Sequence, residues 1–128
     1  MMIQDTVNKL RAAIIGCGRI SSYYEDILDT QKPHSHAGAF SYNEEVDLVA
    51  ASDISEKARS DFRDRWNVQT FESYEKMIEE TRPDIVSVCT PPEMHFDQIK
   101  KVINNFDFVK VIWCEKPLSN SVSESLKL

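Results

Sequence analysis

A turn bounded by two glycines is the first segment whose residues could bind a ligand. Gly16 and Gly18 flank one residue directly after the apolar run Arg11–Ile15. Gly16 can adopt the backbone angles of a tight turn, and Gly18 lets the main chain approach a pyrophosphate because it has no Cβ atom. The helix expected to follow would add unpaired amides and the positive end of its dipole. The segment predicts a phosphate-binding turn, although Ser21 replaces the usual third glycine and an ordinary strand-to-helix turn is the alternative.

Asp53 is a candidate for binding a ribose, because it follows the second apolar run, Asp47–Ser52. Its carboxylate could accept hydrogen bonds from ribose hydroxyls and would repel a 2′-phosphate. It lies 35 residues beyond Gly18 (53 minus 18), against a usual spacing of about 20. We attribute the excess to an inserted loop and helical turn within residues 26–45. No basic residue follows at once, which favours NAD over NADP; the alternative is that Asp53 caps the next helix.

Two further segments follow predicted strands and could line a cofactor groove. Thr90-Pro91-Pro92-Glu93-Met94-His95 leads from a strand into a helix, with proline at the first helical position. In Glu115-Lys116-Pro117, a partly buried lysine could polarise or deprotonate a substrate hydroxyl. From local sequence alone, the alternative for the first segment is an ordinary loop in which His95 forms local hydrogen bonds. The alternative for the second is a solvated Glu–Lys pair before a turn proline.

The cysteines predict no metal site. Cys17, Cys89 and Cys114 all fall near the ends of predicted strands, but none has C-x-x-C spacing, and buried cysteine usually acts as a small apolar residue. His34 and His36 lack a matching acid or thiol pattern. An odd number of widely spaced cysteines fits a reducing compartment, so we expect a cytoplasmic protein.

Short apolar runs alternate with amphipathic segments along the whole chain. Strands are expected at residues 11–15, 47–52, 68–71, 84–89 and 109–113, and helices at residues 55–66, 73–81, 93–105 and from Ser121. This alternation predicts α/β class, with a doubly wound, mostly parallel Rossmann-type sheet of order 3-2-1-4-5. We assign residues 1–128 to a single domain, because 128 residues is a typical domain length.

Composition restricts the partners. The chain has 21 acidic and 15 basic residues and a formal net charge of −6, which disfavours binding to nucleic acid. No apolar run approaches the roughly 18–20 residues that cross a bilayer, and residues 1–11 lack the apolar region of a secretory signal. We therefore expect neither a nucleic-acid partner nor a membrane association.

Taken together, these segments resemble the N-terminal domain of the Gfo/Idh/MocA oxidoreductases, which include glucose-fructose oxidoreductase and inositol dehydrogenase. The similarity runs from about Leu10 to the end of the chain and covers AAIIGCGRIS, HAGAF, LVAASDIS, DIVSVCTPPEMH and CEKPLS. It implies that Lys116 lies near the reacting carbon of the substrate, with Glu115 and Pro117 shaping a turn whose Lys116–Pro117 bond is often cis. The implied cofactor-binding residues are Gly16, Cys17, Gly18, Arg19, Ile20, Asp53, Thr90, Pro91, His95, Glu115, Lys116 and Pro117.

The resemblance implies an NAD-dependent oxidoreductase that acts on a CH–OH group of a sugar, polyol or related small molecule. Family members continue into an α/β substrate domain, so we expect this chain to be truncated before that domain and to have little turnover alone. Relatives usually associate through that domain. The sequence therefore leaves the oligomeric state undetermined, and a homo-oligomer is one possibility. The alternatives are a non-catalytic module that senses NAD(H) or a sugar through a partner, and a Rossmann-type methyltransferase, which would not explain E-K-P.

Overall fold

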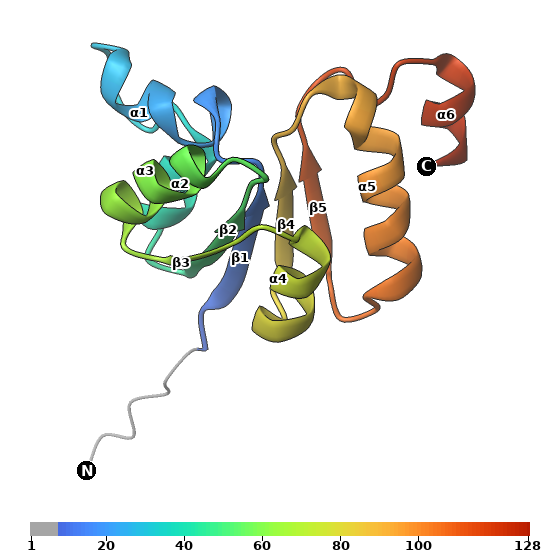
Figure 1. Cartoon of the computed structure of the whole chain (residues 1–128), viewed down its shortest axis with the longest axis horizontal. Coiled ribbons are helices and arrows are strands. Elements are labelled where there is room, and N and C mark those ends of the chain that lie inside the picture. Colours follow the sequence, from blue (N-terminus) through green and yellow to red (C-terminus); the bar gives the residue numbers. More distant parts are fainter. Residues whose placement is uncertain (1–7) are drawn as a thin grey trace.

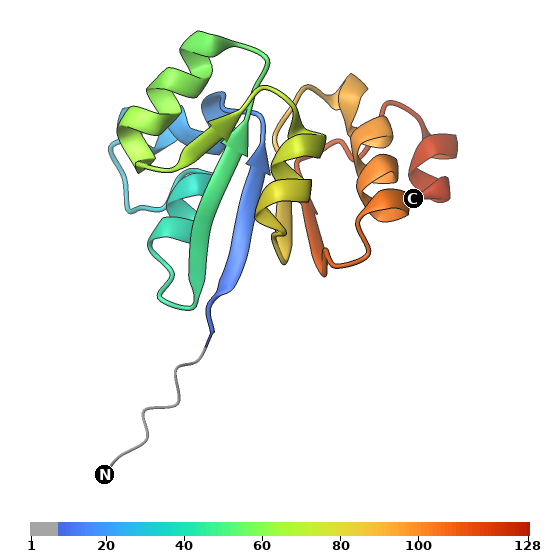
Figure 2. The ribbon, with the colours of Figure 1, turned by 60° about the horizontal axis from the view of Figure 1, so that its bottom comes forward.

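The computed structural model describes residues 8–128 and contains a five-stranded sheet in which every neighbouring pair is parallel (Figure 1). The order β3-β2-β1-β4-β5 confirms the predicted topology. In Figure 2 the arrows of β1 and β2 point the same way. Residues 1–7, which the sequence places in the same domain, lie outside the described residues. The strands are β1 (Leu10–Ile15), β2 (Val46–Ser52), β3 (Gln69–Phe71), β4 (Ile85–Val88) and β5 (Val111–Cys114).

The helices lie in the connections between strands and after β5. A five-residue π-helix, η1, leads directly into the single α-helical turn α1, so the helix after the glycine turn is short and irregular. The insertion predicted within residues 26–45 contains one short helix, α2. The bounds are η1 (Arg19–Tyr23), α1 (Tyr24–Ile27), α2 (His36–Ser41), α3 (Glu56–Trp66), α4 (Tyr74–Thr81), α5 (Pro92–Asn105) and α6 (Val122–Lys127).

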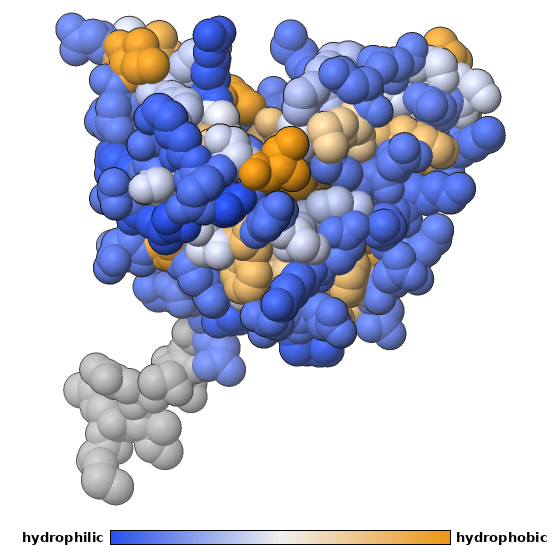
Figure 3. Space-filling model, viewed as in Figure 1, coloured by the Kyte–Doolittle hydropathy of each residue, from blue (hydrophilic) through white to orange (hydrophobic). Residues whose placement is uncertain are grey.

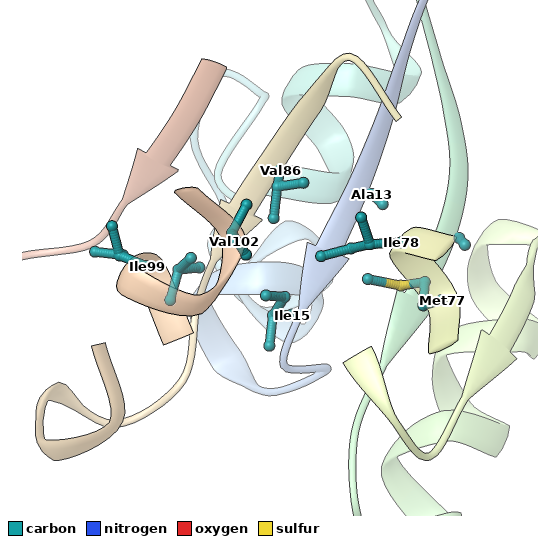
Figure 4. Close-up of a cluster of buried hydrophobic side chains, with 9 residues drawn as sticks. Ala13, Ile15, Met77, Ile78, Val86, Ile99 and Val102 are labelled. Carbon is teal, nitrogen blue, oxygen red and sulfur yellow. The ribbon is translucent and has the colours of Figure 1, made fainter. Parts of the chain in front are cut away.

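Alternate residues of β1 belong to two different hydrophobic cores. Ala13 and Ile15 pack in the core that includes side chains from α4 and α5, as drawn in Figure 4. Ala12 and Ile14 pack in the core formed with α2 and α3. Because successive side chains of a strand point to opposite faces, this pattern requires helices on both faces of the sheet. The central strand is therefore shielded from water on both sides.

Serine residues fix the beginnings of four helices, one of which is α2, where the hydroxyl of Ser35 accepts the amide of Gly38 at 2.9 Å. The hydroxyls of Ser55, Ser73 and Ser121 accept the amide hydrogen bonds of Ala58, Lys76 and Glu124, as expected for N-cap residues. Ser55, rather than Asp53, therefore caps α3. The carboxylate of Asp53 is therefore not used as a helix cap and instead accepts the amide of Cys17 in the glycine turn.

The last strand differs from its predicted bounds. β5 begins at Val111 rather than Val109, because the amide of Val109 is used in a turn that bonds the carbonyl of Phe106. The strand extends one residue further than expected, to Cys114, so the E-K-P segment begins immediately after it. The carboxyl ends of β1, β2, β4 and β5 thus carry all the predicted site segments at one edge of the sheet.

Candidate functional site

A groove of about 630 Å³ lies at the carboxyl edge of the sheet. Its walls come from the turn after β1, the end of β2, the start of α4, and the loop from β4 into α5. The space-filling view shows a hollow at the upper edge of the molecule, between the surface over α1 and the surface over α5 (Figure 3). Pockets of about 300–1,000 Å³ at this edge of a doubly wound sheet are typical of small-ligand and cofactor sites.

Gly16 and Gly18 have different roles in the turn. Gly16 has a φ of +100°, and a Cβ atom there would lie 3.1 Å from the carbonyl carbon and oxygen of Cys89. A Cβ atom on Gly18 would meet no other atom within 4 Å, because this residue faces the open groove. The turn therefore needs Gly16 for its conformation, whereas Gly18 leaves space beside the main chain for a ligand.

The turn continues into η1, whose backbone is held by Gly18. The amides of Ser22 and Tyr23 and the hydroxyl of Ser21 all donate to the carbonyl oxygen of Gly18. The side chain of Ser21 is fully buried and bonds within the turn, so it fits in place of a third glycine. The amides of Arg19 and Ile20, in the first turn of η1, precede these donors, and both residues line the groove.

Asp53 links the end of β2 to the glycine turn. One carboxylate oxygen accepts the amide of Cys17 at 2.9 Å, and the other accepts the amide of Ser55 at 2.8 Å. Each carboxylate oxygen has a second lone pair, so the group can still accept hydrogen bonds from a ligand. The half-buried side chain of Asp53 lines the groove beside Gly18. Two segments that are 36 residues apart in the chain therefore form one surface.

The basic residues after Asp53 are already paired. Arg59 donates to the carbonyl oxygens of Asp53 and Ile54 and forms an ion pair with Glu56. Lys57 pairs with Asp61 at 2.9 Å on the exposed side of α3. Neither cation is therefore free to face the groove next to Asp53.

The β4–α5 loop contributes Thr90 and Pro91 to the groove, but it buries His95. His95 is 1% exposed, and its two ring nitrogens lie 2.7 Å from the carbonyl oxygen of Thr90 and 2.8 Å from that of Pro117. The sequence places His95 among the cofactor-binding residues. In the structure it lies behind the groove wall and connects that wall to the E-K-P turn.

The E-K-P turn lies outside the groove lining. The Lys116–Pro117 peptide bond is cis, as the resemblance implies. Lys116 is exposed, and Glu115 is directed to His36, with 2.7 Å between Oε1 and Nε2. Among residues 8–128, Lys116 has no carboxylate partner within salt-bridge distance. Glu115 and Lys116 therefore form no ion pair, but Lys116 is solvated, as that alternative has it, and is not partly buried as the sequence-based hypothesis expected.

The three cysteines are thiols in apolar surroundings. Burial, together with the nearby charge of Asp53, raises the pKa of the Cys17 thiol to about 12, and burial raises that of Cys114 to about 11. Burial also raises the pKa of Cys89. Because thiolates are the reactive form, these cysteines are not activated nucleophiles.

Within residues 8–128, no group of three or more His, Cys, Asp or Glu side chains is arranged to hold a metal ion. The same residues include no helix that is long and apolar enough to span a membrane.

Several groove residues were not predicted from the sequence. Ile54 lies next to Asp53, and Met94 lies one position before His95, so both are neighbours of residues that the sequence identifies. Glu72 and Tyr74 follow the short strand β3 and form the far side of the groove. Their only available signal was their place after a strand, which is the same signal that pointed to Asp53. Cys17, by contrast, contributes its amide to Asp53 while its side chain is buried below the turn.

The parallel sheet, the glycine turn and the acid at the end of β2 define a dinucleotide-binding domain of the Rossmann class. The sequence pattern of the Gfo/Idh/MocA oxidoreductase family, described as having an NAD-binding Rossmann fold, matches residues 10–128. The chain belongs to this family.

Individual relatives agree in fold and are much longer. D-glucoside 3-dehydrogenase of Escherichia coli (strain K12) is 26% identical over 113 residues, which are 88% of this chain and 28% of that protein. The WlbA dehydrogenase of Chromobacterium violaceum, crystallised with NADH and UDP-GlcNAcA, is 27% identical with a TM-score of 0.74, covering 98% of this chain and 32% of that one. A myo-inositol 2-dehydrogenase of Lactobacillus plantarum is 26% identical with a TM-score of 0.69, and the match covers 91% of this chain and 30% of that one. The chain therefore spans about a third of the length of these relatives.

Proposed function

We propose that this chain is the NAD-binding domain of a dehydrogenase that oxidises a CH–OH group of a sugar, a polyol or a related small molecule. The observation that carries the proposal is the pairing of the Gly16–Gly18 turn with Asp53 on one wall of the groove. Three relatives named above are dehydrogenases, two of them of a glucoside and an inositol, which supports the substrate class.

The residues around the groove match the chemical needs of a dinucleotide. The open space beside Gly18 fits a diphosphate, and the adjacent amides of Arg19 and Ile20 can donate to its oxygens. The carboxylate of Asp53 can accept hydrogen bonds from ribose hydroxyls. Thr90 and Pro91 face it across the groove and would contact the cofactor along its length.

The charges next to Asp53 support NAD rather than NADP. A 2′-phosphate placed at the ribose would meet the Asp53 carboxylate. The cations that follow Asp53 in the chain would not compensate, because Arg59 is paired with Glu56 and Lys57 with Asp61. NAD⁺, when bound, supplies the hydride acceptor for oxidation of an alcohol carbon. Lys116 would hold or accept the proton of the substrate hydroxyl, because an exposed amine without a carboxylate partner is available for that contact.

Titration of the chain with NADH, followed by cofactor fluorescence, tests the binding proposal directly. Wild-type protein should give a saturable signal, and Gly18→Val should weaken it at least tenfold because the branched side chain enters the space beside the turn. Asn104→Val is a matched control, since it adds a valine at an exposed position at the opposite end of α5 and should leave binding unchanged. Circular dichroism of both variants verifies that they fold.

Two outcomes would contradict the proposal. If Gly18→Val bound NADH as tightly as the wild type, the turn would not be the phosphate site. If S-adenosylmethionine raised the melting temperature and NADH did not, the domain would be of the methyltransferase type. Turnover of NAD⁺ with sugar and polyol alcohols, measured on protein that includes any following domain, separates the dehydrogenase from a non-catalytic sensor.

A further inference from the structure

The residues on both sides of Lys116 are held by buried histidines. On one side, the carboxylate of Glu115 contacts Nε2 of His36 at 2.7 Å. On the other, the carbonyl oxygen of Pro117 contacts Nδ1 of His95 at 2.8 Å. Both imidazoles are at most 2% exposed. The turn that carries Lys116 is therefore anchored at two points although Lys116 itself is exposed.

His36 is itself fixed in orientation by three elements. It belongs to α2, its Nδ1 lies 2.9 Å from the hydroxyl of Ser87 on β4, and its ring stacks on Trp113 of β5 with centroids 3.8 Å apart. Burial lowers the pKa of His36, so the ring is neutral at neutral pH. A neutral ring satisfies both contacts when Nε2–H donates to Glu115 and Nδ1 accepts from Ser87. Rotation of the ring would break both bonds.

The contact with His36 decides which group Glu115 can bind. Glu115 is adjacent to Lys116 in the chain, and its side chain is 29% exposed, so an ion pair with the lysine is the obvious alternative. Such a pair would keep the lysine protonated and occupy its ammonium group. In the structure the carboxylate instead points to the buried imidazole, and the amine of Lys116 is left without a carboxylate in the described part of the chain.

We propose that His36 is a positioning residue for Lys116: by binding Glu115, it keeps the lysine amine unpaired and available to the substrate hydroxyl. The inference rests on the proposed function, which places Lys116 at the reacting end of the site. It assigns a role to His36, the histidine of the HAGAF segment, for which the sequence predicts no function. His36 does not touch the groove, and so it acts through Glu115 alone.

The pairing state of Lys116 can be measured without cofactor or substrate. Trace acetylation with acetic anhydride at pH 8, followed by peptide mass spectrometry, gives the rate at each lysine, and Lys110 serves as an internal reference. In His36→Leu, the released Glu115 should pair with Lys116 and slow its acetylation about two- to fivefold, as expected for an exposed ion pair. His36→Gln keeps a donor for Glu115 and should restore the wild-type rate.

Two further variants make the result specific to the carboxylate. Glu115→Gln added to His36→Leu should return the rate at Lys116 to the wild-type value, because it removes the competing charge. Glu115→Gln alone should change that rate by less than twofold, since the wild-type carboxylate is already bound to His36. This second test needs no change in the buried residue and remains valid if His36→Leu fails to fold.

An increase of several-fold in Glu115→Gln alone would overturn the proposal, because it would mean that Glu115 pairs with Lys116 in the wild type. An unchanged rate in folded His36→Leu would overturn it as well. Neither result depends on NADH. Loss of NADH binding by the wild type would instead contradict the proposed function, so the two failures are distinguishable.

Discussion

Gly16 and Gly18 lie two positions apart, yet their surroundings predict opposite responses to the same substitution. Gly16 has a positive φ, and a Cβ atom there would crowd the Cys89 carbonyl, whereas Gly18 has a φ of −88° and faces open space. We expect Gly16→Ala to lower the free energy of unfolding by about 1–2 kcal/mol. Gly18→Ala should leave it unchanged or slightly raised, because alanine restricts the unfolded chain. Urea denaturation of both variants measures the difference, and equal losses would contradict the assignment of roles within the turn.

Asp53 permits a separate test of cofactor selection. In Asp53→Asn the amide oxygen can still accept the amide of Cys17, but the charge that repels a 2′-phosphate is removed. We expect the ratio of NADPH to NADH affinity to rise about tenfold, equivalent to about 1.4 kcal/mol. Fluorescence titration with both cofactors measures this ratio. An unchanged ratio in a folded variant would show that Asp53 does not choose between the two cofactors.

Residues that act through neighbours in the chain could be found from the sequence, and residues that act across the fold could not. Gly16, Gly18 and Asp53 stand directly after apolar runs, so their strands identify them. His36 contacts Glu115 across 79 positions, and only the packing of α2 against β4 and β5 brings them together. No local pattern distinguishes such a histidine from one on a loop.

At the scale of elements, His95 connects the loop after β4 to the turn after β5. Replacing it with leucine leaves the carbonyl oxygens of Thr90 and Pro117 without this partner in part-buried surroundings. We expect His95→Leu to reduce the free energy of unfolding by about 1–3 kcal/mol, the cost of unsatisfied buried polar groups. Lys100→Leu, at an exposed position of the same helix, is the matched control and should change stability by less than about 0.5 kcal/mol. Urea denaturation measures both variants. Equal losses in the free energy of unfolding would contradict the role of His95 in connecting the two segments.

Periodicity and caps predicted most of the elements because those signals are local. The serines that cap α3, α4 and α6 lie where the sequence places them, and α5 ends at Asn105 as expected. The π-helix after the glycine turn was not predicted, because its backbone depends on the buried contacts of Ser21 and Ser22. Ile103 of α5 is 53% exposed, although Ile99 and Val102 of the same helix are buried.

At the scale of the whole molecule, the distribution of ionisable groups determines the pH range of stability. Several carboxylates have a lowered pKa in the folded protein. Glu25 is one of them: burial opposes its ionisation, but hydrogen bonds from His34 and Ser35 outweigh that effect. The buried thiols have a raised pKa, about 12 for Cys17. Stability should therefore fall below about pH 4.5, where unfolded carboxylates take up protons, and above pH 9, where unfolded thiols lose them.

His36 should add a separate loss of stability on the acid side, nearer to neutral pH. Its pKa is lowered from 6.5 because it is buried, so the unfolded chain binds a proton there at a pH where the folded protein does not. The stabilising contribution is complete above pH 6.5 and decreases as the pH falls below that value. The urea midpoint should thus decline between pH 7 and pH 5.5, before the carboxylates titrate. His36→Gln has no proton to take up at this position, and its midpoint should decline less over the same interval. Identical pH profiles for the two proteins would mean that the pKa of His36 is the same in the folded and unfolded chains. A steeper decline in His36→Gln than in the wild type would mean that the pKa is raised on folding, as expected if the bond to Glu115 were an ion pair.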